Sequence, residues 1–406
     1  MDSSRQHTGL GTRINRSGCD AVKSGSAKSA RRIPQQIDDA DLHRVPPSCL
    51  GERMTAVLQR TSHGYRKYIA MWLAPWLIAC AFADLHAGDS SRPYLVFEKT
   101  NEIVLDVGPP GSFDSTQAKY PCVQRVGDEW WMWYNGRTDD RFAGSIGLAT
   151  SRNGLQWTKR NHGKPVFRHG PDGAFDATKV DHPAVLFFED RFHMWYTAGD
   201  AESRYTIGYA TSRDGIEWTR ANEARPVLTP GRPGQFDDQL VLHPAVVRDE
   251  TGLLHMWYNG VGPQESFRVG HAVSRDGVHW ERENRGLPVL EPHHVDEFEE
   301  GYVYNVFVMR EEGMFHMWYS AWTTDGRVSG PNHNGITHAV SRDGNRWVRD
   351  DTPTLTNGVA GSLDDYACFA CWIIRGGDEF RMYYSAASGG ADGVYRVCLA
   401  TCALPE

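Results

Sequence analysis

Two histidines stand at equivalent places before prolines in this chain, and an aspartate precedes the first of them. Asp181 and His182 immediately precede one proline, and His243, 61 residues after His182, immediately precedes another. Histidine titrates near neutral pH, so an imidazole can replace a carboxyl group in proton transfer. Unlike ionisable groups that converge on one concave mouth are the pattern of a candidate active site. We therefore take Asp181, His182 and His243 as the first candidates for catalysis.

Matching positions elsewhere in the chain extend this candidate site. The other pairs that begin an equivalent apolar run are Lys119-Tyr120, Tyr304-Asn305 and Phe369-Ala370. We expect Lys119, Tyr120, Tyr304 and Asn305 to contact substrate. Two further acids, Asp238 and Glu300, lie just upstream of such runs and add candidate proton donors or acceptors.

These residues belong to a repeat that is marked by an aromatic run. The run reads Trp131-Met132-Trp133-Tyr134-Asn135-Gly136 first, and similar runs start at 193, 255, 316 and 381. A constant spacing of this size indicates stacked or radial repeats, each one a supersecondary unit. Every unit opens with a Gly-x-Phe-Asp turn or a looser version of it, and most units close with Ser-Arg-x-Gly-x-x-Trp.

Four short strands per unit are expected between these turns, because the apolar runs are brief and are bounded by glycine, asparagine and aspartate. Four strands repeated radially are typical of a β-propeller, and the five runs predict five blades. The last unit lacks the closing segment, whereas residues 94–105 resemble it. We therefore expect an all-β, five-bladed propeller in which an N-terminal strand completes the last blade and closes the ring.

A residue that recurs in every unit is expected to serve the blade, and a polar residue found in one unit only is free to serve a site. The repeated acids Asp114, Asp176, Asp237 and Asp364 are thus interpreted as turn caps that accept bonds from backbone N–H groups. The tryptophans of the closing turns are interpreted as core residues. The residues at the start of the strand that lines the axis in each unit are then the candidates for chemistry.

The repeated motifs, taken together, resemble the five-bladed propeller glycosidases of the arabinanase, levansucrase and invertase superfamily, including glycoside hydrolase family 43. The resemblance spans about residues 94–406 and implies an enzyme that cleaves glycosidic bonds with two or three carboxylates. It places Asp181 near one family acid and suggests Glu300 as general acid. The acid of the first blade, which precedes a proline in that superfamily, is replaced here by Tyr120.

The loops between the second and third strands of each blade are expected on the same mouth. They contribute Arg137, Trp322 and His333, of which Trp322 is the candidate for stacking on a sugar ring. Long loops on a rigid scaffold commonly carry function. A divalent cation such as calcium, held on the propeller axis by the histidines and water, is a further expectation.

Three functions remain open from the sequence. The first is a glycoside hydrolase-like enzyme acting on an oligo- or polysaccharide at the axial funnel. The second is a carbohydrate-binding propeller without catalysis, and the third is an enzyme with other, His/Asp or metal-assisted chemistry on the same scaffold. The net charge of −8 and the lack of a basic stripe argue against nucleic acid as a partner.

The chain before the propeller reads as two segments. Residues 1–53 are polar and without apolar periodicity, so we expect them to be disordered. Residues 54–83 have the basic start, the apolar stretch and the small residues of a signal peptide or apolar anchor. Cys80 lies in a lipobox-like sequence. We expect a secreted or periplasmic protein that contacts membrane only through this segment or a lipid at Cys80, with residues 84–406 as the propeller.

Four of the eight cysteines cluster in the last repeat, at 368, 371, 398 and 402. Two of them are three residues apart within a strand pattern, where such residues point to opposite faces. Buried thiols are the first interpretation, a disulfide is the second and a zinc site is the third.

Overall fold

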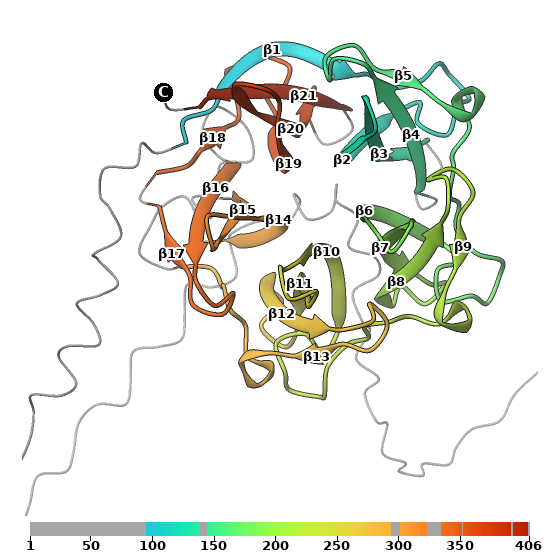
Figure 1. The fold of residues 1–406 in the computed structure, drawn as a ribbon, viewed down its shortest axis with the longest axis vertical. Helices are drawn as coiled ribbons and strands as arrows, with labels where there is room; N and C mark the ends of the chain where they lie inside the picture. Colours follow the sequence, from blue (N-terminus) through green and yellow to red (C-terminus); the bar gives the residue numbers. More distant parts are fainter. Residues whose placement is uncertain are drawn as a thin grey trace, which may run out of the picture.

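The computed structural model describes residues 95–138, 144–293, 301–322, 334–350, 352–390 and 393–404. Five blades surround a central axis (Figure 1). The first blade runs from β2 (Gln117–Val126) to β5 (Thr158–Lys159), and the second contains β6 (Lys179–Phe188), β7 (Arg191–Gly199), β8 (Tyr205–Ser212) and β9 (Thr219–Arg220). The third blade contains β10 (Leu240–Arg248), β11 (Leu254–Val261), β12 (Arg268–Ser274) and β13 (Glu281–Arg282). The fourth blade contains β14 (Tyr302–Glu311), β15 (Met314–Trp322), β16 (Asn334–Ser341) and β17 (Val348–Arg349). The five-bladed all-β architecture is confirmed.

The N-terminal strand closes the ring. The fifth blade contains β19 (Ala367–Arg375), β20 (Glu379–Ser388) and β21 (Val394–Ala403), and β1 (Glu98–Leu105) pairs antiparallel with β21 as its outer strand. Within the first blade, β3 (Glu129–Arg137) and β4 (Ser145–Ser151) lie between β2 and β5. The short β18 (Leu355–Thr356) pairs with β16 in the fourth blade. The predicted closure is therefore confirmed, with its strand beginning at Glu98.

The aromatic runs form the second strand of each blade and bury both faces. Trp133, Trp195 and Trp257 are fully buried, and each indole N–H donates to the glycine carbonyl of the next blade's Ser-Arg-x-Gly turn at 2.9–3.0 Å. Tyr383 donates in the same way to Gly154, at 2.8 Å, across the junction between the fifth and first blades. The closing turns therefore join each blade to its neighbour.

The junction between the fourth and fifth blades differs from the others, because residues 95–105 and 393–404, which hold the two outer strands of the fifth blade, contain no Ser-Arg-x-Gly-x-x-Trp turn. The indole nitrogen of Trp318 is buried and has no hydrogen-bond partner among the described residues. The tryptophans of the turns themselves are partly buried and pack against core residues of the adjacent blade; for example, Trp218 lies edge-on to Trp133. Their interpretation as core residues is confirmed.

The repeated aspartates are buried ion-pair partners. Asp114 accepts hydrogen bonds from the hydroxyl of Tyr134 at 2.8 Å and from Nζ of Lys159 at 2.6 Å. Asp176 and Asp237 bind a tyrosine and an outer-strand arginine in the same manner. The prediction that backbone N–H groups bind these carboxylates is wrong: each joins the blade's second strand to its outer edge.

Every innermost strand contains a bulge at the same position. The residue there has a left-handed backbone, with φ between 47° and 54°, and the strand register shifts at this point. The five residues are Tyr120, His182, His243, Asn305 and Ala370. An extra residue in one strand bends it and redirects a side chain. The bulges thus determine which side chains reach the axis.

Cys122, Cys368, Cys371, Cys398 and Cys402 are buried free thiols, as the first interpretation of the cysteines predicted. Burial raises the pKa of each of them. Within the part of the chain that the structure describes, no helix is long and apolar enough to cross a membrane. The predictions for residues 1–53 and 54–83, including Cys80, lie outside the described residues.

Candidate functional site

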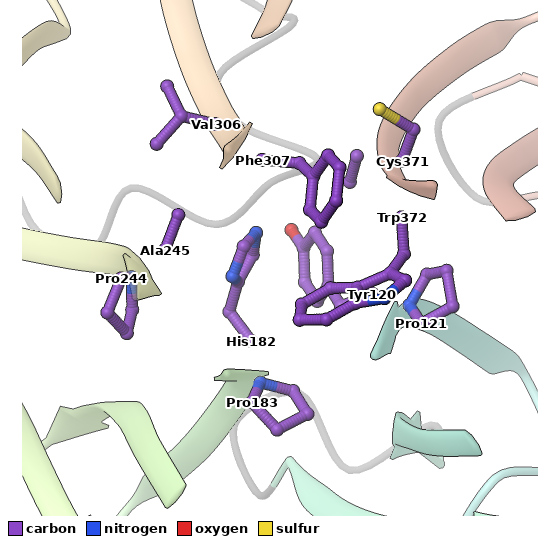
Figure 2. Close-up of a pocket in the computed structure, with 11 residues that line it drawn as sticks. Tyr120, Pro121, His182, Pro183, Pro244, Ala245, Val306, Phe307, Cys371 and Trp372 are labelled. Carbon is purple, nitrogen blue, oxygen red and sulfur yellow. The ribbon is translucent and has the colours of Figure 1, made fainter. Parts of the chain in front are cut away.

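Three of the bulge residues bring their rings together on the propeller axis. The ring centroids of Tyr120 and His182 are 4.7 Å apart, and those of His182 and His243 are also 4.7 Å apart. Figure 2 shows Tyr120 and His182 side by side at the centre, with residues from all five blades around them. We call Tyr120, His182 and His243 the axial cluster. The predicted convergence of His182 and His243 is present in the structure.

Large side chains from the fourth and fifth blades close the axis beside this cluster. Phe307 and Trp372 pack with ring centroids 4.8 Å apart and line the same narrow cavity as Tyr120 and His182 (Figure 2). The volume of this cavity is about 10 Å³, roughly that needed by one water molecule. A sugar therefore cannot pass through the ring at this level.

A buried asparagine holds the third blade's histidine. Asn259 Oδ1 lies 3.3 Å from Nδ1 of His243 and accepts the backbone N–H of Asn305 at 2.9 Å. Asn259 also donates through Nδ2 to the carbonyl of Val303 at 3.0 Å, which defines its amide orientation. Because an amide oxygen only accepts, Nδ1 of His243 carries the proton. In the neutral imidazole, Nε2 is then the proton acceptor.

Asp181 is placed beside a lysine that the sequence argument did not select. Its Oδ2 lies 3.2 Å from Nζ of Lys179, and both side chains are largely buried. Its Oδ1 is buried without a hydrogen-bond partner among the described residues. Both polar atoms of the Asn305 side-chain amide are likewise buried without a hydrogen-bond partner among the described residues. Buried polar atoms are normally bonded, so these two groups are available to a ligand hydroxyl.

Lys119 lies between the first and fifth blades and is fully buried. Its Nζ is 4.7 Å from the ring centroid of Tyr120 and 5.0 Å from that of Tyr395. Cations over aromatic faces are stabilised by the ring quadrupole, more strongly when water is excluded. Lys119 therefore places a buried positive charge beside Tyr120, whereas the charge of Lys179 is paired with the carboxylate of Asp181.

Two of the predicted aromatic residues, Tyr304 and Trp322, form a wall with Phe267 beside the axial cluster. Phe267 stacks on His243 with a centroid distance of 6.4 Å and lies 6.0 Å from Tyr304. The indole N–H of Trp322 donates to the hydroxyl of Tyr304. Trp322 is only 7% exposed, so in this structure it supports the wall and presents little surface for stacking on a sugar.

Of the remaining candidates, two lie at strand ends or turns of the blades and two lie outside the described residues. Asp238 Oδ2 accepts the N–H of Gly234 at 2.6 Å, within its own turn. Arg137 is buried at the end of β3, where its carbonyl accepts from Thr116. Glu300 and His333 lie outside the described residues. The catalytic and binding roles of all these residues stay predictions.

The described residues contain no group of three or more His, Cys, Asp or Glu side chains that could hold a metal ion. A calcium ion on the axis therefore stays an expectation without a described ligand set. Sequence reasoning also missed Lys179, Asn259 and Phe267. Asn259 carried a signal, since the fifth position of every aromatic run is a small polar residue, but the bond that it makes to the following blade's bulge is a feature of the ring.

Comparisons with known proteins agree with this architecture. A family model described as β-1,4-mannooligosaccharide phosphorylase matches residues 131–327, slightly under half of the chain. An uncharacterised protein of Mycobacterium tuberculosis is 29% identical over 239 residues, which cover 57% of this chain and 76% of that protein. A 1,2-β-oligomannan phosphorylase of Thermoanaerobacter is 28% identical over 145 residues, covering 33% and 46% of the two chains.

Solved structures share the fold. One described as a glycoside hydrolase has a TM-score of 0.62 and 19% identity, and the match covers 82% of this chain and 97% of that chain. A second, from work on family 130 mannoside phosphorylases and on glycoside hydrolases within that family, has a TM-score of 0.61 and 16% identity, covering 78% and 98%. The solved structures therefore share the five-bladed fold, and the chain is similar in sequence to phosphorylases of β-linked mannose oligomers.

Proposed function

We propose that this carbohydrate-active enzyme transfers a glycosyl group from a β-linked mannooligosaccharide to inorganic phosphate. The observation that carries the proposal is the chemistry of the five bulge residues, which are Tyr120, His182, His243, Asn305 and Ala370. None of them is a carboxylate. Hydrolysis by this class of enzyme uses two carboxyl groups, one of them to activate water or attack the sugar. Phosphate is already an ionised nucleophile and needs no such base.

Positive charge near the axis supports an anionic co-substrate. Lys119 is buried against Tyr120 of the axial cluster, Lys179 is buried beside Asp181, and His182 and His243 add two imidazoles. Cationic groups in a site from which water is excluded bind phosphate strongly. The family model and the Thermoanaerobacter relative both carry the names of phosphorylases that act on β-linked mannose oligomers, which gives the proposed sugar.

The proposed reaction breaks the bond between the anomeric carbon and the glycosidic oxygen. A phosphate oxygen forms the new bond to the anomeric carbon, and the electron pair of the broken bond goes to the leaving oxygen. We assign the proton for that oxygen to the imidazolium of His182, which at 9% is more exposed than His243 at 2%. Asp181 and Asn305 are proposed to bind sugar hydroxyl groups. The products are mannose 1-phosphate and the shortened oligosaccharide.

The test is to incubate purified protein with β-1,2- and β-1,4-mannobiose, with and without inorganic phosphate. We expect mannose 1-phosphate to form in proportion to the phosphate added, and little free mannose to form without it. Release of free mannose at the same rate in both conditions would identify a hydrolase and refute phosphorolysis. Tight sugar binding without any turnover would instead identify a binding module.

A further inference from the structure

A second pocket lies on the outside of the third blade, away from the axis. It is lined by Pro230, Gly231, Arg232, Gln235, Arg282, Arg285 and Gly286, and it is an open depression of about 460 Å³. Three of the seven lining residues are arginines and none is acidic. An exposed pocket of one charge sign concentrates ligands of the opposite charge.

Comparison with the first and second blades shows that two of these three arginines are features of the third blade. The position of Arg232, two residues before the turn glycine, is Pro109 in the first blade and Pro171 in the second. The position of Arg285 is His162 and Glu223 in those blades. The backbone is the same, since Glu223 and Arg285 have φ values of 55° and 59°. The blade itself therefore does not require arginine at either place.

Arg282 contributes a guanidinium whose orientation is already determined. Its Nε donates to Asp237 at 2.8 Å, and its Nη2 donates to the carbonyl of Thr229 at 2.6 Å. Arginine has five N–H donors, and no bond to the described residues uses Nη1. Arg232 and Arg285 are exposed and form no ion pair with any described acid. Guanidinium N–H groups thus remain for a ligand.

Gln235 adds a polar group to the floor of the pocket. Its Oε1 accepts the backbone N–H of Arg232 at 2.6 Å, so Nε2 is the donor that remains. The first and second blades have Ser112 and Ala174 at this position. Gly286 makes room for the amide, because a Cβ at that position would lie 2.8 Å from Nε2. The pocket therefore combines a hydroxyl-binding amide with three cations.

We infer that this pocket binds the phosphoryl group of a sugar phosphate. Guanidinium groups match phosphate oxygens in geometry and charge, and several of them suit a dianion better than a single carboxylate. The volume exceeds that of a phosphate ion alone and accommodates an attached sugar ring, whose hydroxyl groups meet Gln235 and backbone groups. The inference is independent of the chemistry at the axis.

Calorimetry at low salt tests this pocket with mannose 1-phosphate, inorganic phosphate and mannose as separate probes. The variant R232P/R285E gives the third blade the residues of the second blade at these positions, so its fold is expected to persist; proline also removes the N–H that Gln235 Oε1 accepts. The control Arg213→Ala removes an exposed arginine from a turn outside the pocket. Both variants keep the axial cluster intact.

We expect the wild type and Arg213→Ala to bind mannose 1-phosphate with similar affinity. R232P/R285E should bind it at least about tenfold more weakly. Binding at this site should persist in His182→Asn, which separates it from the axis. Equal binding of inorganic phosphate and sugar phosphate would show that the pocket holds the free anion only and would overturn the sugar requirement. Equal binding by R232P/R285E and Arg213→Ala would overturn the site itself.

Discussion

Removing Lys99 should destabilise the ring at its closure. Nζ of Lys99, on the N-terminal strand, lies 2.5 Å from Oδ2 of Asp364, whose side chain is 3% exposed, and donates to the carbonyl of Thr356 at 2.6 Å. Lys159 and Arg220 make the same pair with their own blade's aspartate. In the fifth blade, the positive charge therefore comes from Lys99 on the N-terminal strand.

The expected cost follows from the buried carboxylate that remains. Removing one partner of a buried pair typically costs 3–5 kcal/mol, since the other charge stays uncompensated. Lys99 is partly exposed, so we expect Lys99→Met to lower the free energy of unfolding by about 3 kcal/mol. For a domain of this size, that corresponds to a fall in Tm of about 6 °C. Thermal and denaturant unfolding, followed by tryptophan fluorescence, would measure both quantities.

Two further variants test the reasoning. Lys164→Met removes an exposed lysine from a loop and should change the free energy of unfolding by less than about 0.5 kcal/mol. The double variant K99M/D364N removes both charges and should recover part of the lost stability. The reasoning is refuted if Lys99→Met is as stable as Lys164→Met, or if the double variant is less stable than Lys99→Met.

Two other predictions concern the blades. Burial lowers the pKa of His271 to about 4, so between pH 6.5 and 4 the unfolded chain binds more protons than the folded one. The free energy of unfolding should therefore be highest above pH 6.5. It should fall by about 3 kcal/mol as the pH drops from 6.5 to 4. His271→Leu, which introduces the residue that the first blade has as Leu148, should remove this part of the pH dependence in denaturant titrations; an unchanged profile would contradict the assignment. Trp257→Phe loses a bond to Gly344, whereas Trp318→Phe loses none among the described residues. Trp257→Phe should therefore cost about 1 kcal/mol more in denaturant unfolding, and equal costs would contradict this role of the closing turns.

The repeat was sufficient to predict the blades, their number and the closing strand. The spacing of the aromatic runs is a local signal, and each run forms the second strand of its blade. The role of the repeated aspartates was not accessible in this way. Asp114 and Lys159 are 45 residues apart, and only the folded blade brings the carboxylate to the amino group.

The axial bulges were also beyond the sequence. A residue before proline usually avoids helical backbone angles, yet Tyr120, His182 and His243 all precede proline with left-handed backbones. Asn305 and Ala370 have the same conformation without a following proline. The ring of blades therefore imposes this conformation. Where the backbone N–H of the bulge residue donates a hydrogen bond to a side chain of the preceding blade, that bond stabilises the bulge. Asn259 provides this for Asn305, and Ser385 for Tyr120.

The bulge separates neighbours that the sequence had grouped. Both residues of each pair, such as Asp181 and His182, were expected to face the axis. In the structure, His182 lines the axial cavity, whereas Asp181 pairs with Lys179. The difference arises because the register shift after Asp181 redirects the next side chain.

Turnover of His182→Asn on the substrate that the wild type cleaves decides whether the axial cluster is the site of chemistry. Asparagine tolerates a left-handed backbone, and the fourth blade has Asn305 at this position with a φ of 51°. Loss of a general acid typically costs 10²–10⁴-fold in rate. We expect kcat to fall by at least about 100-fold while Tm stays within about 2 °C of the wild type. A folded His182→Asn protein with the wild-type rate would contradict the axial cluster as the site of chemistry.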